Sequence, residues 1–328
     1  MATYKGIQGY SVQKLSDDPT ASEAEGQLWY NSSAGKFKLG TAAAGAWASA
    51  PAVNTARRSM AGTGTVTAAV IAGGIGGTTA TETYNGSAWT TSPATLNTGR
   101  QYLKGDGSST AAIVFGGVGP GAAYDLTETF NGSAWTEQTN DLNTARQKMG
   151  NSTLGSTTAS LCFGGSAADP SPSKDDETEL WNGTLWTVKN VLNTARQGIG
   201  GAGTSTAALA IGGNPPESNQ VESWNGTTWT ELTPNLNTAR SEFGSAGSQT
   251  SAVIWGGNPN SPGLLVEQWD GTAWTEVADT AQKHAGGGSA GVNNGSAYAI
   301  SGYDGSGNIT STEQWSDPVY TIKTVTLS

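Results

Sequence analysis

The sequence predicts an all-β protein, a six-bladed β-propeller with four antiparallel strands in each blade. One phrase recurs along most of the chain: an aromatic residue, Asn-Gly, two further residues and Trp, as in residues 224–229. An Asn-Thr-Ala-Arg phrase follows it, as at 237–240, and a glycine pair lies between each such Arg and the next aromatic residue, as at 212–213. The Asn of that phrase stands at 54, 97, 143, 193 and 237, so its intervals are 43, 46, 50 and 44 residues. A period of this length is typical of a propeller blade.

One repeat shows how four strands arise within residues 193–232. Residues 198–203 are small, and residues 207–211 form a short apolar run of the kind found in a strand buried on both faces. Residues 221–224 alternate between apolar and polar, and an Asn-Gly turn then leads into residues 229–232. Because Asn and Gly tolerate positive φ, this turn indicates a tight hairpin between the third and fourth strands.

The two ends of the repeat region complement each other. Residues 46–51 match residues 88–93, so the chain enters the propeller on the fourth strand of a blade. Residues 313–315 match the third strand at 267–269, and no Trp follows them. The last blade therefore takes its fourth strand from the N-terminal side, which removes an exposed sheet edge. Six blades are expected from the third-strand aromatic residues, which are Tyr84, Phe130, Trp181, Trp224, Trp269 and Trp315.

We expect three parts in the chain: an attachment arm in residues 1–40, the propeller in residues 41–316 and a tail in residues 317–328. Residues 27–37 alternate around a turn, so the arm is expected to contain a small hairpin. The tail is expected to form one more strand or an extended arm against a neighbour.

The composition excludes several function classes. The chain has 328 residues, 13% of them charged, and a net charge of −10, which argues against a nucleic-acid partner. It has no apolar run of 18 residues, so membrane insertion is not expected. Cys162 and His284 are each the single residue of their kind, so no internal disulfide and no multi-histidine metal site can form. We expect no cofactor, no metal and no catalytic residue, with Cys162 buried in a strand and His284 facing solvent.

Two series of residues repeat once per blade, and we expect both to be structural. The Arg series could bond carbonyl groups or stack on a neighbouring Trp; the alternative is a ring of Arg around the central channel that holds anions. The fourth-strand Trp series is expected to fill the space between blades, and the alternative is a platform for sugars. The residues are Arg57, Arg100, Arg146, Arg196 and Arg240, with Trp47, Trp89, Trp135, Trp186, Trp229 and Trp274.

The loops between the glycine pair and the third strand vary most in length and sequence. Because all of them lie on one face of a propeller, they are the expected binding surface. An acidic run at 174–177 favours a solvated loop over a Ca²⁺ site, since it lacks a recognised ligand spacing. The candidate binding residues are Tyr124, Asp125, Asp169, Asp175, Asp176, Glu217 and Trp255.

The glycine pair, the third-strand aromatic residue and the fourth-strand Trp resemble the kelch repeat over residues 46–315. That family folds as a β-propeller. The aromatic residue and the Trp are five positions apart here, as in Tyr84 and Trp89, which is a tighter hairpin than kelch repeats usually show.

The N-terminal arm resembles the short modules that open fibre and appendage chains of tailed bacteriophages. The similarity lies in residues 26–31, Gly-Gln-Leu-Trp-Tyr-Asn, and residues 35–38, Gly-Lys-Phe-Lys. The resemblance implies a non-enzymatic virion protein, a tail fibre or capsid appendage assembled in the host cytoplasm. Its arm would dock to other virion proteins, its propeller would meet a host-surface glycan, and the chain would form a homo-oligomer such as a trimer.

Two other functions stay open at this point. One is a soluble carbohydrate-binding propeller that uses Trp255 or a loop residue such as Tyr124. The other is a polysaccharide hydrolase with paired carboxylates drawn from Asp125, Asp169 or Glu217.

Overall fold

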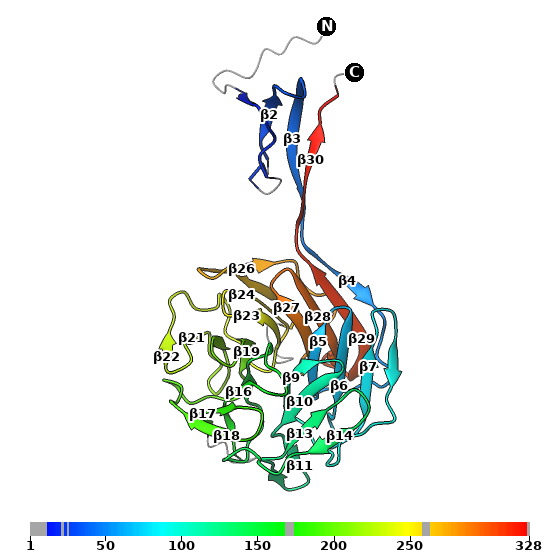
Figure 1. Ribbon diagram of the computed structural model, residues 1–328, viewed down its shortest axis with the longest axis vertical. Coiled ribbons are helices and arrows are strands. Elements are labelled where there is room, and N and C mark those ends of the chain that lie inside the picture. Colours follow the sequence, from blue (N-terminus) through cyan, green and yellow to red (C-terminus); the bar gives the residue numbers. More distant parts are fainter. Residues whose placement is uncertain (1–11, 21–22, 25, 168–173, 258–262, 327–328) are drawn as a thin grey trace. The chain divides into compact units, whose positions relative to one another are not determined.

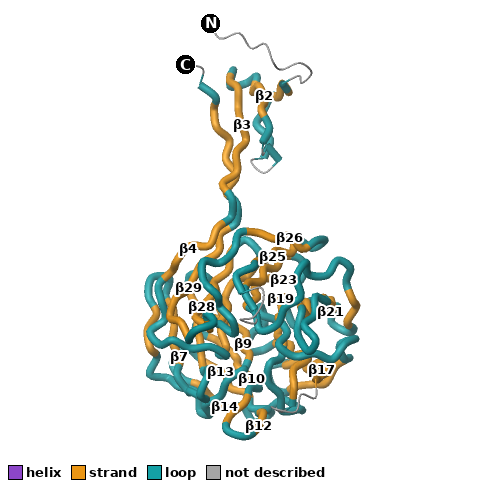
Figure 2. The backbone as a smooth tube through the Cα atoms, turned by 180° about the vertical axis from the view of Figure 1, so that it is seen from behind, coloured by secondary structure: helices purple, strands orange, loops and turns teal. Residues whose placement is uncertain are grey.

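The computed structural model describes residues 12–20, 23–24, 26–167, 174–257 and 263–326, and these residues form strands and loops with no helix (Figure 2). The chain divides into two compact units. The larger unit is Trp47–Ser316, and the smaller unit combines Met1–Ala46 with Asp317–Ser328. Both chain ends therefore belong to the smaller unit.

The larger unit holds six four-stranded antiparallel sheets within its described residues, in chain order around a centre (Figure 1). The first blade runs from its innermost to its outermost strand as β5 (Ala61–Thr65), β6 (Ala68–Ala72), β7 (Thr81–Tyr84) and β8 (Trp89–Thr91). The second blade has the same order, with β9 (Lys104–Ser108), β10 (Ala111–Phe115), β13 (Thr127–Phe130) and β14 (Trp135–Glu137). The third blade consists of β15 (Gly150–Asn151), β16 (Ser160–Ser166), β17 (Lys174–Trp181) and β18 (Trp186–Lys189). The fourth blade consists of β19 (Gly200–Gly203), β20 (Ala208–Ile211), β21 (Val221–Trp224) and β22 (Trp229–Glu231). The fifth blade consists of β23 (Gly244–Ser248), β24 (Ser251–Trp255), β25 (Val266–Trp269) and β26 (Trp274–Val277).

The sixth blade closes the propeller with strands from both ends of the repeat region. Its order is β27 (Gly288–Asn293), β28 (Ser296–Tyr303), β29 (Asn308–Ser316) and β4 (Ala46–Ala50). The fourth strand thus comes from the N-terminal side, as the sequence predicts, and the count of six blades is confirmed.

The innermost strands surround a central channel. Each innermost strand contacts the innermost strand of the next blade. The order around the circle is β5, β9, β15, β19, β23 and β27, and β27 contacts β5 again. β15 is short because residues 152–155 leave the strand. The Asp106 carboxylate of β9 accepts hydrogen bonds from this segment and its neighbours: Ser152 Oγ at 2.6 Å, Asn151 Nδ2 at 2.8 Å and Ser160 Oγ. Asp106 therefore holds the irregular inner strand of the third blade in place.

The aromatic residues of the third and fourth strands form the packing between blades. Trp224 and Trp229 have ring centroids 5.2 Å apart, and Trp229 also meets Phe163 of the preceding blade at 4.9 Å. Trp229 Nε1 donates to Thr178 Oγ1 of that blade at 2.9 Å. Five of the six fourth-strand Trp residues are buried, and Trp47 is partly buried in the cluster around Trp255 and Trp315. The series is the core between blades, so it offers no platform for sugars.

The smaller unit is a four-stranded sheet in the order β1 (Gln13–Leu15), β2 (Leu28–Asn31), β3 (Lys36–Ala43) and β30 (Val319–Thr324). β2 and β3 are the hairpin expected in the arm. β30 pairs with β3 from Ala43 opposite Val319 to Lys38 opposite Thr324. The C-terminal segment is therefore a strand of the arm's own sheet, and the break between the units falls at Trp47.

Candidate functional site

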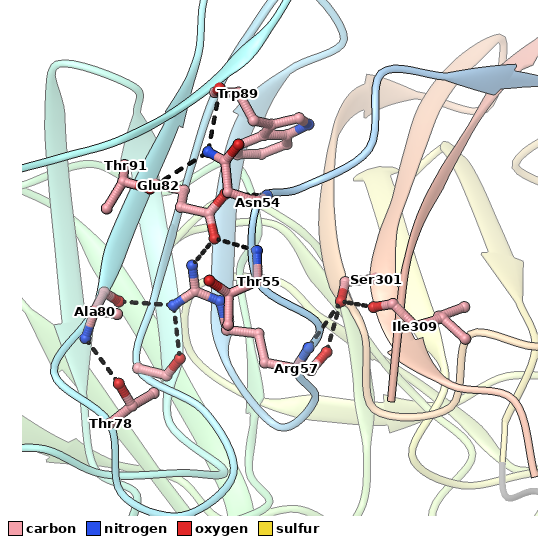
Figure 3. A network of polar contacts seen from close by, with 11 residues as sticks. Asn54, Thr55, Arg57, Thr78, Ala80, Glu82, Trp89, Thr91, Ser301 and Ile309 are labelled. Atoms are coloured by element: carbon pink, nitrogen blue, oxygen red, sulfur yellow. Dashed lines mark hydrogen bonds and ion pairs between the residues drawn. The ribbon is translucent and has the colours of Figure 1, made fainter. Parts of the chain in front are cut away.

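A buried Arg–Glu pair organises the start of the first blade (Figure 3). The Arg57 guanidinium pairs with Glu82 of β7 and donates from Nη1 to Ala80 O at 3.0 Å. Glu82 also accepts the backbone N–H groups of Asn54 at 2.7 Å and Thr55 at 3.2 Å. The Asn-Thr-Ala-Arg phrase is thus a loop folded around one third-strand carboxylate.

The same pair occurs in the next four blades. Each Arg and each Glu is buried. Because every guanidinium is committed to its own blade, the alternative in which the Arg series rings the channel to hold anions is wrong. The Glu partners were missed from the sequence, although they lie two residues before each third-strand aromatic residue. The pairs are Arg100–Glu128, Arg146–Glu179, Arg196–Glu222 and Arg240–Glu267.

The sixth blade replaces the Arg with His284. We expected this side chain to face solvent, but it is fully buried, with Nε2 3.0 Å from Glu313 Oε1 and Nδ1 2.7 Å from Ser301 O. When Glu313 is ionised, both partners are hydrogen-bond acceptors, so the two contacts are complete only when both ring nitrogens carry hydrogen. Ser301 Oγ further joins this blade to the first one, since it donates to Arg57 O at 2.7 Å (Figure 3).

A closed ring of backbone hydrogen bonds surrounds one end of the central channel. It is built from the residue two positions after each Arg, or after His284. The N–H group of each member donates to the carbonyl oxygen of the preceding member, with N···O distances from 2.6 to 3.2 Å. All six members have φ between 54° and 64°. We call these residues the mouth ring: Ser59, Tyr102, Lys148, Gly198, Glu242 and Gly286.

The mouth ring carries five residue types at its six positions, with glycine at both 198 and 286, while the backbone stays the same. Lys148 Nζ lies 3.2 Å from Glu242 Oε1 and 4.7 Å from the centre of the Tyr102 ring. All three side chains are partly exposed and line a cavity of about 50 Å³. Nearby on the same blade ends, the Arg58 guanidinium lies 4.4 Å from the centre of the Tyr303 ring. This cluster of charged and aromatic groups is the best-formed candidate site of the described chain.

Sequence reasoning missed the mouth ring because, apart from the two glycines, its members share no residue type. The only signal was their constant spacing from the Arg series, and that signal has meaning only when the ring of backbone bonds is seen.

Some predicted loop residues lie on the same face as the mouth ring. Glu217 Oε1 accepts from Ser241 Oγ at 3.4 Å, directly beside Glu242. Gln101, next to Tyr102, bridges to Val118 in the loop that carries Tyr124 and Asp125. That loop forms a small hairpin of β11 (Val118–Gly119) and β12 (Ala122–Ala123).

The other predicted residues do not join this cluster. Trp255 is fully buried in β24, so the expectation that it contacts a ligand is wrong. Asp175 lies 3.8 Å from Arg146, and burial raises the pKa of its carboxyl group. The carbonyl of Asp176 accepts from Leu192 N at 2.8 Å, and Asp169 lies outside the described residues. Within the described ranges, no group of three or more His, Cys, Asp and Glu side chains is arranged to hold a metal ion.

Cys162 is fully buried in β16, and burial raises the pKa of its thiol to about 12. Such a thiol stays protonated at neutral pH and is a packing residue. The described residues contain no helix long and apolar enough to cross a membrane.

Comparison with solved structures shows the fold. The structure of YjhT matches with a TM-score of 0.67 and 14% sequence identity, over 83% of this chain and 99% of that chain. The chain therefore has the fold of a kelch-like β-propeller. No protein-family model matches the chain, and no curated protein matches its sequence.

Proposed function

We propose that this chain is a non-enzymatic structural protein of a tailed-phage virion, a tail fibre or capsid appendage that displays its propeller and binds a host-surface glycan. The binding surface in this proposal is the mouth ring and the loops beside it. One observation carries it: six equivalent backbone positions at the channel mouth hold five residue types, including Tyr102, Lys148 and Glu242. Variable side chains on a constant scaffold are typical of a recognition surface.

The rest of the repeat leaves few other groups for recognition. The repeated Arg, Glu and Trp side chains are engaged in the blades. The mouth combines an aromatic ring, an ammonium group and a carboxylate within a few ångströms. A sugar presents apolar C–H faces and many hydroxyl groups, so a partly exposed ring next to charged hydrogen-bonding groups suits it.

The smaller unit supports attachment to a particle. It is built from both chain ends, and its sheet carries apolar side chains that face solvent. Leu28 is 44% exposed and Phe37 is 38% exposed, and the register of β2 and β3 places both on one face of the sheet. Exposed apolar groups gathered on one face of a small sheet suit a docking surface. In this proposal the face contacts another virion protein, and the resemblance of residues 26–38 to phage appendage modules supports that role.

Immunogold electron microscopy of virus particles tests the proposal. Antibody raised against residues 47–316 should label the particles, either at the tail or over the capsid. If no particle carries label, the virion role is wrong, and the alternative of a soluble carbohydrate-binding propeller takes its place.

Glycan binding by the full-length chain tests the site. Tyr102→Ala should weaken binding to host-surface glycans at least tenfold. The control Tyr320→Ala changes a tyrosine of β30, outside the propeller, and should leave the affinity unchanged. Equal affinity of wild type and Tyr102→Ala would remove the mouth ring from the site. Release of new reducing ends from the glycan would instead support a hydrolase.

A further inference from the structure

A second cavity of about 30 Å³ lies between the innermost strands of the propeller. Its polar lining comes from five of the six blades. The polar side chains that line it are Thr63, Lys104, Asn151, Thr153, Ser245 and Ser289. Lys104 also lines the larger cavity at the mouth, so it borders both spaces.

Lys104 breaks the repeat at this position. The equivalent residues of the other blades are Ala61, Gly150, Gly200, Gly244 and Gly288. At most of these sites a side chain has no room: a Cβ on Gly150 would lie 2.2 Å from the Phe163 ring, and one on Gly244 would lie 2.3 Å from the Trp255 ring. The long Lys104 side chain therefore departs from the small residues at the equivalent positions, and the packing of the innermost strands does not require it.

The two carboxylates whose charges act on Lys104 each have other partners. Burial lowers the pKa of Lys104, while the charges of Glu242 and Asp106 act in the opposite direction. Glu242 pairs with Lys148 at 3.2 Å, and Asp106 is occupied by Ser152, Ser160 and Asn151. Among the ion pairs found within 4 Å in the described residues, none involves Lys104. The Lys104 amino group thus borders a confined space without an ion-pair partner among the described residues.

Two hydroxyl groups add hydrogen-bond donors to the same cavity. Ser245 Oγ accepts the backbone N–H of Gly201 at 3.2 Å, and Ser289 Oγ accepts the backbone N–H of Ser245 at 3.3 Å. Each oxygen already acts as an acceptor, so its own hydrogen is left to donate. By contrast, Thr63 and Thr153 donate to the carbonyl oxygens of Gly107 and Gly247. Lys104, Ser245 and Ser289 therefore supply donors that no acceptor in the described residues matches.

We propose that this cavity binds a small monoanion, held by the Lys104 ammonium and the hydroxyl groups of Ser245 and Ser289. A single water needs about 10–15 Å³ of such space, so the cavity suits a group of two or three heavy atoms and not a sugar ring. The anion is a free halide ion or the carboxylate of a larger molecule seated at the mouth. The site does not depend on the proposed host-glycan role.

Bromide is the probe for the test. Crystals of the full-length protein soaked in sodium bromide should show an anomalous bromine peak in the cavity. The peak should disappear in Lys104→Met and persist in Lys189→Met, which removes a lysine of the outer strand β18. No peak in the wild-type protein, or a peak of equal height in Lys104→Met, would overturn the proposal.

A second variant guards against loss of folding in Lys104→Met. Ser245→Ala combined with Ser289→Ala keeps the cation and should reduce bromide occupancy at least twofold; unchanged occupancy would contradict the role of the hydroxyl groups. In solution, bromide should raise the Tm of the wild type by about 2 °C over gluconate at equal ionic strength, because it binds the folded state. The Tm of the double variant should rise less.

Competition separates the two sources of the anion. Sodium acetate that displaces bromide from the crystal would show that carboxylates share the site. Acetate that leaves the bromine peak unchanged would exclude the carboxylate source and leave the halide.

Discussion

His284 and Glu313 form the one buried pair among the six equivalent pairs of the described propeller whose basic partner is an imidazole and not a guanidinium. Nε2 of the ring lies 3.0 Å from Glu313 Oε1 at a place where the other blades carry Arg. The pair lies in the blade that closes the propeller, so it bears on the stability of the closure.

His284→Gln should destabilise the protein by about 3 kcal/mol at pH 7, because it removes the basic ring that pairs with the buried Glu313 carboxylate. His284→Arg restores the pair of the other blades and serves as the matched control. Chemical denaturation at pH 7 measures the free energy of unfolding of each variant. Equal losses in both variants would show that the size of the side chain matters and its charge does not.

The loss of stability at low pH should also change in His284→Gln. Burial raises the pKa of Glu313, but hydrogen bonds from His284 and from the N–H groups of Ala281 and Gln282 outweigh it, so the pKa lies below its ordinary value. A carboxyl group with a lowered folded pKa stabilises the fold above its ordinary pKa, and this contribution is lost as the pH falls through the folded pKa. In His284→Gln the loss should begin at a higher pH, measured as Tm between pH 7 and pH 3.

The buried Arg100–Glu128 pair of the second blade predicts a large loss of stability when one of its two side chains is truncated. Arg100→Ala should lower the free energy of unfolding by about 3–5 kcal/mol, because Glu128 is left buried and unpaired. The double replacement Arg100→Met with Glu128→Leu should cost less than Arg100→Ala alone. Arg58→Ala, which removes the contact with the Tyr303 ring, should cost less than about 1 kcal/mol. A double variant as unstable as Arg100→Ala would show that desolvated charge is not the cause.

A hydrogen bond between blades that is missing at Trp274 predicts a substitution that restores it. Trp135, Trp186 and Trp229 each donate from Nε1 to a Thr of the preceding blade at 2.9 Å. The equivalent residue before Trp274 is Val221, and Trp274 Nε1 is buried without a partner. Val221→Thr should therefore be neutral or stabilise by up to about 1 kcal/mol.

The control for that substitution is Val253→Thr in β24, a position that is not equivalent to the Thr residues of this series. It should destabilise by about 1–3 kcal/mol, because it buries a polar group without a matched partner. If the two variants lose equal stability in urea titrations, the Thr–Trp bond does not form in the fifth blade.

The mouth ring predicts a backbone effect at Gly286, whose φ is 60°. Gly286→Ala should destabilise by about 1 kcal/mol, because a Cβ disfavours this region. Gly286→Asn should cost less, since Asn tolerates positive φ. Denaturation of the three proteins under one condition checks the order, and a loss in Gly286→Asn as large as in Gly286→Ala would point to crowding instead of φ.

The repeat could be predicted from the sequence because its signals are local. Asn-Gly turns, glycine pairs and aromatic residues at fixed spacing describe one blade, and six copies leave little choice of fold. The partners of these residues could not be predicted in the same way. Glu313 lies 29 residues after His284, and β30 pairs with β3 about 280 residues away, so each contact depends on how the whole chain closes.

The channel mouth was missed for the opposite reason. Apart from two glycines, its members differ in residue type, so a search for repeated residues passes over them. Trp255 was misjudged because an aromatic residue at the end of an apolar strand looks the same whether it is buried or exposed.

The backbone hydrogen bonds of the mouth ring do not involve the side chains that the ring presents, so the shape of the mouth and its surface chemistry can change independently. Since amide and carbonyl groups alone make the ring, a codon change at Tyr102, Lys148 or Glu242 alters what the face presents while the circle stays closed. Selection can then act on each position singly, without a second mutation to repair the scaffold. Single substitutions at these positions can thus change the surface of the mouth, within the set of residues that tolerates a positive φ.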